Sequence, residues 1–315
     1  MKHALVLGGA GFLGSAVVHE LTRRGWRVTA ATRHQRNYPN LADTSIRQVA
    51  GDFTETDHLR RLLRGQDFVV DASAPYLPAS LPRLGRSDRS GSTRALRTMG
   101  RRLEVVSGAT PRYAFISSFT TLKRSRRALL HPYFDLKMRM EDLVRSVKGL
   151  QAIIVNPVTC LGPGDLRTAE LSMPLWLLGE GPRVVPDHEI HVLDVRDLAS
   201  ELARAILEDR WGERLPLWGQ RVSLPDLARS WCRLAGCPPP RIALPAPWLM
   251  APAALQDGWA QATGRAAGHR LLALLLIAEQ EGLPMPAATP PSRPLLQTLK
   301  DMMAWYASLA GSHEL

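Results

Sequence analysis

The chain has 315 residues, of which 45% are hydrophobic and 22% charged, which is typical of a soluble globular protein with room for one large α/β domain and a smaller companion. Its formal charge is +11, but the densest basic segments (83–102 and 123–127) lack interleaved aromatic residues, so no nucleic-acid partner is expected. No signal peptide is visible, and the longest strongly apolar run (271–278) is too short to span a bilayer. We therefore expect a cytoplasmic protein without a membrane partner.

Apolar runs alternate with helical patterns over the first half of the chain. Strands are expected at 5–7, 27–32, 46–49, 68–71, 113–117 and 152–156, with helices between them at 12–24, 57–64, 93–106 and 133–148. This alternation predicts an α/β fold, a Rossmann-type doubly wound parallel sheet with helices on both faces.

The pattern changes after Asn156, where proline and glycine become frequent. One amphipathic helix is expected at 195–207, and the chain beyond residue 224 is mostly helical. We predict that residues 1–157 plus about 190–218 form the Rossmann domain. Residues about 158–189 plus 219–315 are expected to form a smaller, mainly helical substrate-binding region at the carboxyl edge of the sheet.

A glycine-rich loop follows the first expected strand and opens the first helix. Gly8 permits a tight turn, Gly11 lets the backbone approach a pyrophosphate, and Gly14 lets helix and strand pack closely. The helix start at Phe12 and Leu13 supplies amide donors and a partial positive charge. The loop therefore predicts a dinucleotide site; a glycine turn without a ligand is the alternative.

Arg33 stands at the end of the second expected strand, where NAD sites place an acidic residue for the ribose 2′-hydroxyl. A guanidinium suits a 2′-phosphate instead, and His34 and Arg36 follow closely. We therefore predict NADP(H) as the cofactor of the Rossmann domain, with NAD(H) as the alternative.

Tyr133 and Lys137 share one face of an expected helix. An ammonium near a tyrosine favours the phenolate and lowers the tyrosine pKa, so the pair is suited to proton transfer. Ser117 and Ser118 follow the fifth expected strand. A catalytic site at this pair would give the chain a reason to bind a dinucleotide.

Together these segments resemble the extended short-chain dehydrogenases/reductases, the NAD(P)-dependent epimerase/dehydratase family. The resemblance runs nearly end to end, over 8–14, 51–53, 71–74, 115–118, 133–137, 156–165, 191–199 and 293–306. The run Asn-Pro-Val-Thr at 156–159 is most similar to the dihydroflavonol-reductase and 3β-hydroxysteroid-dehydrogenase branch. Nucleotide-sugar enzymes usually carry Arg-Pro-x-Asn at this place.

The resemblance implies roles for individual residues. Tyr133 exchanges a proton with the substrate, and Ser118 hydrogen-bonds the substrate oxygen, with Ser117 or Thr120 as alternatives. Lys137 holds the nicotinamide ribose, Asp52 contacts the adenine and Pro157 lies at the nicotinamide. The expected cofactor contacts are Gly8, Gly11, Phe12, Leu13, Gly14, Arg33, Asp52, Phe53, Ala72, Ser73, Ala74, Lys137 and Pro157.

The function expected from these motifs is NADPH-dependent reduction of a ketone or aldehyde in a small molecule, such as a secondary metabolite or a thioester-linked compound. One alternative is a nucleotide-sugar epimerase or dehydratase with a tightly held cofactor. The run 119–121 lacks the Asp-Glu pair that sugar-nucleotide dehydratases use, which disfavours elimination. A non-enzymatic NADP(H)-sensing protein is the other alternative, and the retained Tyr–Lys pair disfavours it.

Three expectations concern partners. The basic segment 123–127 suggests a phosphate-bearing carbonyl substrate, with a solvated loop as the alternative. The histidines and cysteines show no ligand spacing, so no metal is expected. The resemblance also implies a homodimer through the helices at 93–106 and 133–148.

Overall fold

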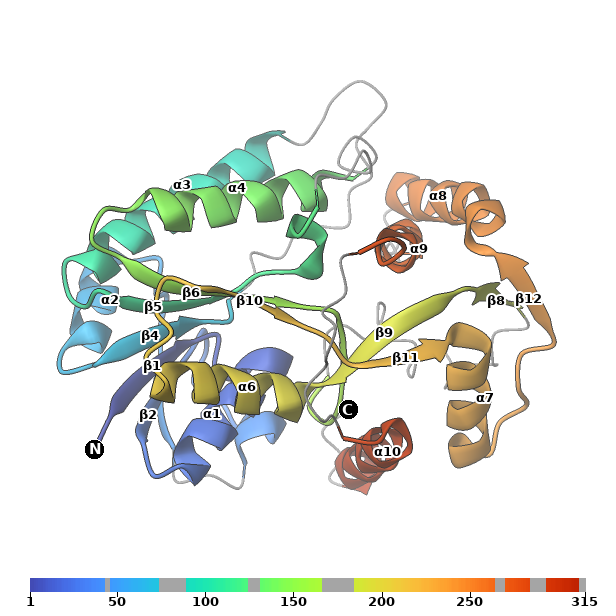
Figure 1. The fold of residues 1–315 in the computed structure, drawn as a ribbon, viewed down its shortest axis with the longest axis horizontal. Coiled ribbons are helices and arrows are strands. Elements are labelled where there is room, and N and C mark those ends of the chain that lie inside the picture. Colours follow the sequence, from blue (N-terminus) through green and yellow to red (C-terminus); the bar gives the residue numbers. More distant parts are fainter. Residues whose placement is uncertain are drawn as a thin grey trace.

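The structure is a computed structural model that describes residues 1–42, 46–73, 89–123, 131–165, 184–263, 270–283 and 293–311. Its main sheet has seven strands, all parallel, in the order β10-β6-β5-β4-β1-β2-β3 (Figure 1). These are β1 (His3–Leu7), β2 (Arg27–Thr32), β3 (Arg47–Ala50), β4 (Phe68–Asp71), β5 (Arg112–Ile116), β6 (Gln151–Pro157) and β10 (Arg214–Leu217). The strand order reverses between β1 and β4, and this is the crevice in which doubly wound sheets bind their ligands.

Helices cover both faces of the main sheet (Figure 1). On one face lie α1 (Phe12–Arg23) and α6 (Val195–Leu207), whose apolar residues pack with the strands in one core. On the other face, a second core holds residues of α2 (Thr56–Leu63), α3 (Arg89–Ser107) and α4 (Pro132–Ser146). Because both faces are covered, β1 is apolar throughout its buried length instead of alternating.

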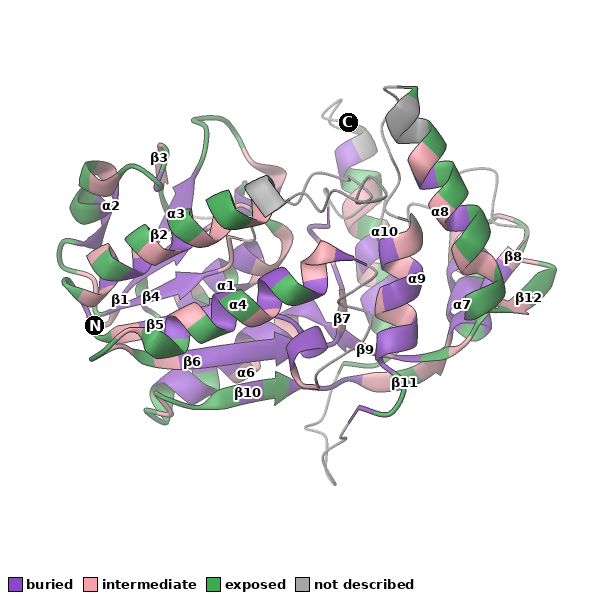
Figure 2. Cartoon of the chain, turned by 90° about the horizontal axis from the view of Figure 1, so that it is seen from above, coloured by how far each residue is buried: buried purple, intermediate pink, exposed green. Residues whose placement is uncertain are grey.

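The second region combines two small sheets with helices. The strands β11 (Gln220–Ser223), β9 (Glu189–Asp194) and β7 (Thr159–Leu161) form one sheet, and β12 (Ile242–Pro245) pairs with β8 (Val184–Asp187) in the other. The helices are α7 (Leu224–Ala235), α8 (Ala246–Ala262), α9 (Arg270–Glu279) and α10 (Leu295–Gly311). Figure 2 shows α9 mostly buried and α8 more exposed. The region is mainly helical, as predicted, but the sequence predicts none of its short strands.

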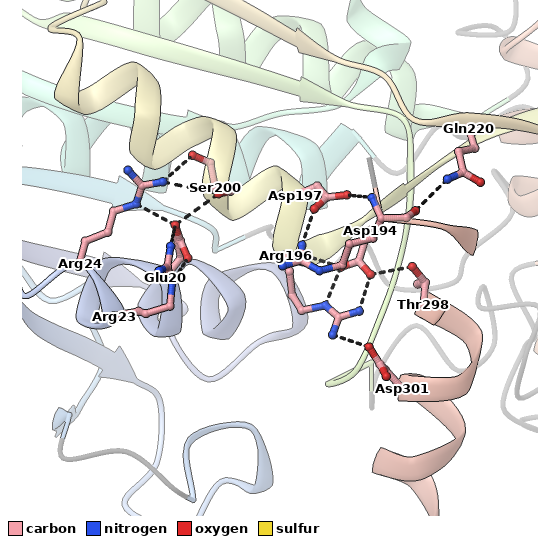
Figure 3. A network of polar contacts seen from close by, with 11 residues as sticks. Glu20, Arg23, Arg24, Asp194, Arg196, Asp197, Ser200, Gln220, Thr298 and Asp301 are labelled. Carbon is pink, nitrogen blue, oxygen red and sulfur yellow. Dashed lines mark hydrogen bonds and ion pairs between the residues drawn. The ribbon is translucent and has the colours of Figure 1, made fainter. Parts of the chain in front are cut away.

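A polar network docks the last helix, α10, onto α6 (Figure 3). Arg196 of α6 donates two side-chain hydrogen bonds to the Asp194 carboxylate, at 2.9 and 2.6 Å, and another at 2.6 Å to Asp301 of α10. The Thr298 hydroxyl of α10 donates to Asp194 at 2.7 Å. Since Asp194 also caps α6, one carboxylate joins both helices.

The predicted elements match the observed ones closely in the first half of the chain, where β2 and β4 have their predicted bounds. β9, in the segment assigned to the Rossmann domain, pairs in the small sheet, whereas β10 joins the main sheet. The division into domains stays a prediction. Among the described helices, none has the length and apolar character needed to cross a membrane.

Candidate active site

A cavity of about 510 Å³ opens at the carboxyl ends of the main-sheet strands and extends to the second region. It collects residues that are far apart in the sequence. Of the predicted site residues, its lining includes Gly8, Gly11, Phe12, Leu13, Arg33, Phe53, Ala72, Ser73, Ser118, Tyr133 and Pro157. Gly14, Asp52 and Lys137 are not part of the lining, and Ala74 lies outside the described residues.

The glycine loop forms one end of this cavity. Gly8 has a φ of +76°, and the Gly11 amide donates a hydrogen bond to the Gly8 carbonyl at 3.0 Å. A Cβ at Gly14 would overlap the same carbonyl, so only glycine allows this approach of helix and loop. The start of α1 has no side-chain cap and no acidic residue in its first turn. Its amides are therefore available to an anion, which fits the pyrophosphate of a dinucleotide.

Basic side chains line the cavity beyond β2. Arg33, His34 and Arg36 are exposed residues of its lining. The Arg36 guanidinium lies 4.8 Å from the ring centroid of Tyr38, whose hydroxyl donates to the His34 carbonyl at 3.0 Å. These contacts order a loop that presents positive charge next to the glycine loop.

Asp52 and Phe53 follow β3 and face different surroundings. Asp52 is exposed, and a hydrogen bond from the Thr54 backbone amide at 2.9 Å is the main cause of its lowered pKa. Phe53 is buried on the cavity wall, and the guanidinium of Arg102 lies 5.0 Å from its ring centroid. Phe53 therefore supplies an aromatic surface to the cavity, while the Asp52 side chain is turned to solvent.

Asp71 ends β4 and lies in a buried polar cluster, which the sequence does not predict. Its carboxylate accepts hydrogen bonds from Arg102 and from the Tyr113 hydroxyl, both at 2.6 Å, and from the Ser73 amide at 2.9 Å. Burial alone would raise the pKa of Asp71, but the charge of Arg102 and hydrogen bonds from the side chains of Ser73, Tyr113 and Arg102 lower it. The ionised carboxylate thereby fixes Ser73 on the cavity wall.

Tyr133 lies in the first turn of α4, beside Ser118. Burial raises the pKa of Tyr133, and a hydrogen bond with Ser118 only partly offsets this effect. The Ser118 hydroxyl also accepts hydrogen bonds from the Thr120 hydroxyl at 3.0 Å and the Thr120 amide at 3.3 Å, inside the short helix η2 (Phe119–Thr121). Tyr133 is therefore a protonated phenol at neutral pH, next to a positioned serine.

Lys137 lies one helical turn after Tyr133, and only 5% of its surface is exposed. Burial lowers the pKa of Lys137 to about 8, although the charges of Asp71 and Glu141 raise it. Its Nζ lies 6.0 Å from the ring centroid of Tyr133. Burial outweighs the Ser118 hydrogen bond in the pKa of Tyr133, and the effect of Lys137 on that pKa stays a prediction.

Glu141, one further turn along α4, has a side chain that is 1% exposed and was not predicted. One carboxylate oxygen accepts hydrogen bonds from Ser117 at 2.6 Å, Asn156 at 2.7 Å, and Thr121. The other accepts from Arg145 at 2.7 Å and from Arg214. Because the Ser117 hydroxyl donates its hydrogen bond to Glu141, Ser118 is the better candidate for the hydroxyl that faces a substrate.

The cavity wall in the second region is largely apolar. It includes Val158, Leu161, Ile190, Leu227, Leu276 and Ile277, and Asp165 is the charged side chain among its described residues. Lys123 of the predicted basic segment donates to the Glu281 carbonyl at 2.5 Å, beyond the end of α9, and is not part of the lining. Residues 124–127 of that segment lie outside the described residues.

Comparison with known proteins agrees with this geometry. Residues 8–169 match the NAD(P)H-binding family, which covers half of the chain and spans the glycine loop, Ser118, Tyr133 and Lys137. The chain belongs to this family. It is an NAD(P)-dependent enzyme of the extended short-chain dehydrogenase/reductase type, as predicted.

Relatives of this extended dehydrogenase/reductase cover most of its length. It is 27% identical to a ceramide reductase of Caulobacter vibrioides, over 82% of this chain and 78% of the relative. It is 24% identical to sterol demethylase protein B of Methylococcus capsulatus, over 80% of each chain. The solved structure of the Bordetella bronchiseptica enzyme WbmH with NAD⁺ matches with a TM-score of 0.70 and 18% identity, covering 98% of this chain and 99% of that one, which shows the shared fold.

Glu141 was not predicted, although the sequence contains a signal for it. It follows Lys137 by four residues, as Lys137 follows Tyr133, so the spacing places all three on one helix face. Arg102 and Tyr113 carry no such signal, because they reach Asp71 from other elements. The nicotinamide cofactor is confirmed by the family match. The choice of NADP over NAD, the roles of the site residues and the homodimer stay predictions.

Proposed function

We propose that this chain is an NADPH-dependent reductase of a ketone or aldehyde carried by an apolar small molecule. The observation that carries the proposal is the phenol of Tyr133, which burial keeps protonated and which hydrogen-bonds Ser118 on the cavity wall. A protonated phenol is the form needed to donate a proton to a carbonyl oxygen during reduction. The name of the ceramide reductase among the relatives supports the same direction of reaction.

In carbonyl reduction, Tyr133, Ser118 and Lys137 would have different roles. A bound nicotinamide supplies a hydride to the carbonyl carbon. Tyr133 donates its proton to the oxygen, and the Ser118 hydroxyl hydrogen-bonds that oxygen while negative charge develops on it. The ammonium of Lys137, one turn away, stabilises the phenolate that Tyr133 leaves behind.

The basic end of the cavity supports NADPH over NADH. Arg33, His34 and Arg36 line it, and none of these positions carries the carboxylate that would hold a ribose 2′-hydroxyl. Arginine forms strong, charge-assisted contacts with phosphate. We therefore assign Arg33 to the 2′-phosphate.

The wall in the second region supports an uncharged, apolar substrate. Its aliphatic residues would bury a hydrocarbon surface. For this reason we propose a carbonyl compound without phosphate, which departs from the phosphate-bearing substrate that the basic segment suggested.

The first experiment follows NADPH absorbance with aliphatic and aromatic ketones and aldehydes of increasing size, and with UDP-glucose. We expect net NADPH oxidation with apolar carbonyl compounds. Tyr133→Phe should lower kcat by roughly 10²- to 10⁴-fold while NADPH binding, measured by fluorescence, stays within about twofold. Interconversion of the sugar nucleotide without net oxidation, or an unchanged rate in Tyr133→Phe, would reject the proposal.

The second experiment tests the cofactor. Arg33→Asp should weaken NADPH binding by at least about tenfold and leave NADH binding nearly unchanged. Arg47→Asp is the matched control, because Arg47 is an exposed arginine on the neighbouring strand and is not part of the cavity lining. Equal binding of NADH and NADPH, unaffected by Arg33→Asp, would contradict the assignment.

A further inference from the structure

Lys137 is buried near two carboxylates that come from different elements. Asp71 ends β4 and Glu141 lies on α4, and both are 1% exposed. Both charges act on Lys137 against the effect of burial. A buried ammonium needs compensation of this kind, because desolvation disfavours its charged form.

The two carboxylates differ in how they are neutralised. Asp71 is paired at 2.6 Å with Arg102, whose side chain is only 10% exposed. The arginines of Glu141 come from the surface, with 45% of the Arg145 side chain and 36% of the Arg214 side chain exposed. Water screens these two arginines more than it screens Arg102. Asp71 exerts the larger effect on Lys137, and Glu141 is the carboxylate that lies on the same helix, one turn away.

Glu141 is also joined to the turn that carries Ser118. Asn156 donates at 2.7 Å to Glu141 and at 3.0 Å to the Ser118 carbonyl, and the Ser117 hydroxyl donates to Glu141 at 2.6 Å. These bonds hold the backbone on both sides of the Ser118 side chain. Tyr133, Lys137 and Glu141 are spaced four residues apart on one face of α4, so a single helix carries all three.

We propose that Glu141 is a positioning residue, which fixes the turn bearing Ser118 and supplies negative charge one helical turn from Lys137. Its part in catalysis rests on the proposed reductase function, whereas its effect on Lys137 depends only on the folded chain. Among the described residues, the Tyr133 hydroxyl lies on the same helix as Lys137. Arg102 and Tyr113 contact Asp71, and Arg145 and Arg214 contact Glu141.

The small number of lysines makes this proposal measurable. The chain has five, Lys2, Lys123, Lys137, Lys148 and Lys300. NMR titration of the chain labelled with ¹³C-lysine would resolve their side chains, and the Lys137→Arg variant would assign the signal of Lys137. We expect Glu141→Gln to lower the pKa of Lys137 by roughly 0.5 to 1 from its starting value of about 8.

Two further variants separate this effect from a general change of charge or packing. Asp142→Asn removes a carboxylate from the next position of α4, where the side chain is 77% exposed, and should leave the pKa of Lys137 unchanged. Arg214→Gln removes a partner of Glu141 but keeps its carboxylate, so the pKa of Lys137 should rise. Opposite shifts in Glu141→Gln and Arg214→Gln identify the Glu141 charge as the cause.

Turnover tests the other half of the proposal. With an active carbonyl substrate, Glu141→Gln should lower kcat roughly tenfold, with the basic limb of the pH profile displaced to lower pH and NADPH affinity retained. An unchanged Lys137 pKa in folded Glu141→Gln would overturn the proposal, as would an equal shift in Asp142→Asn. If Glu141→Gln does not fold, an unmoved Lys137 in Arg214→Gln has the same meaning. The titrations need no substrate, so the absence of carbonyl reduction would reject the proposed function without deciding this one.

Discussion

Lys137 retains a charge in a place that is unfavourable for it. Burial lowers its pKa from 10.5 to about 8, so the folded chain holds this proton less tightly than the unfolded chain. Below about pH 8 the buried ammonium therefore destabilises the fold. The penalty shrinks as the pH rises from 8 through 10.5, where the lysine becomes neutral in both states.

Replacing Lys137 should thus raise the stability of the fold and abolish carbonyl reduction. We expect Lys137→Met to raise the free energy of unfolding at pH 7 by roughly 1 to 3 kcal/mol, and this gain to vanish by about pH 10.5. Carbonyl reduction should be lost. The measurement is urea unfolding across this pH range, with the exposed Lys148→Met as control. A less stable variant at pH 7 would show that Asp71 and Glu141 depend on the lysine more than on their arginines.

Some of the residues of the candidate site can be predicted from the sequence, and others cannot. Tyr133 and Lys137 lie on one helix, so their spacing already brings them together. The cluster around Asp71 draws Arg102 from α3 and Tyr113 from β5, and only the sheet and its covering helix bring them into contact. A linear pattern contains no information of this kind, and it cannot reveal that burial outweighs the Ser118 hydrogen bond in the pKa of Tyr133.

At the scale of elements, the start of α1 depends on a close approach that only glycine allows. A Cβ at Gly14 would overlap the Gly8 carbonyl, which also accepts the hydrogen bond closing the turn. Any side chain must push the first turn of α1 away from β1. The amides that we expect to bind the pyrophosphate would move with that turn.

Gly14→Ala should therefore weaken NADPH binding by at least about tenfold and destabilise the fold by roughly 1 to 3 kcal/mol. Gly100→Ala in α3 is the matched control, because nothing lies within 4 Å of a Cβ at that position. That substitution should raise stability by up to about 1 kcal/mol through helix propensity and leave binding unchanged. Fluorescence titration with NADPH and thermal unfolding measure both effects. Unchanged binding in Gly14→Ala would exclude the loop as the pyrophosphate site.

The elements of the first half were predictable because each one repeats a simple local rule. Strands alternate regularly with amphipathic helices there, and β2 and β4 have the predicted bounds. The strands of the second region, which are three to six residues long, do not follow this alternation. β9 is stabilised by pairing with β7 on one side and β11 on the other, so its strand character depends on partners distant in the sequence.

At the scale of the whole molecule, α10 brings the end of the described chain back to α6, one of the helices that cover the main sheet. The Asp194 carboxylate holds this junction, since it binds Arg196 of α6 and Thr298 of α10 (Figure 3). Burial would raise the pKa of Asp194, but its hydrogen bonds with Arg196 and Thr298 lower it below the ordinary 3.8. The stability that this ionised carboxylate contributes is present above pH 3.8 and is lost as the pH falls through its lowered pKa.

Asp194→Asn should therefore have a pH-dependent cost. At pH 7 we expect a loss of about 2 kcal/mol, because Arg196 and Thr298 lose a charged acceptor. The difference from the unmodified chain should shrink as the pH falls below 3.8 and through the lowered pKa of Asp194, where this carboxylate becomes protonated in the folded state as well. Urea unfolding from pH 7 downward, followed by tryptophan fluorescence, measures this difference. Asp209→Asn removes a carboxylate that is 67% exposed and pairs with Arg112 at the surface, so it should change stability by less than about 1 kcal/mol. A cost of Asp194→Asn that stays constant with pH would mean that the shape of the side chain, and not its charge, joins α10 to α6.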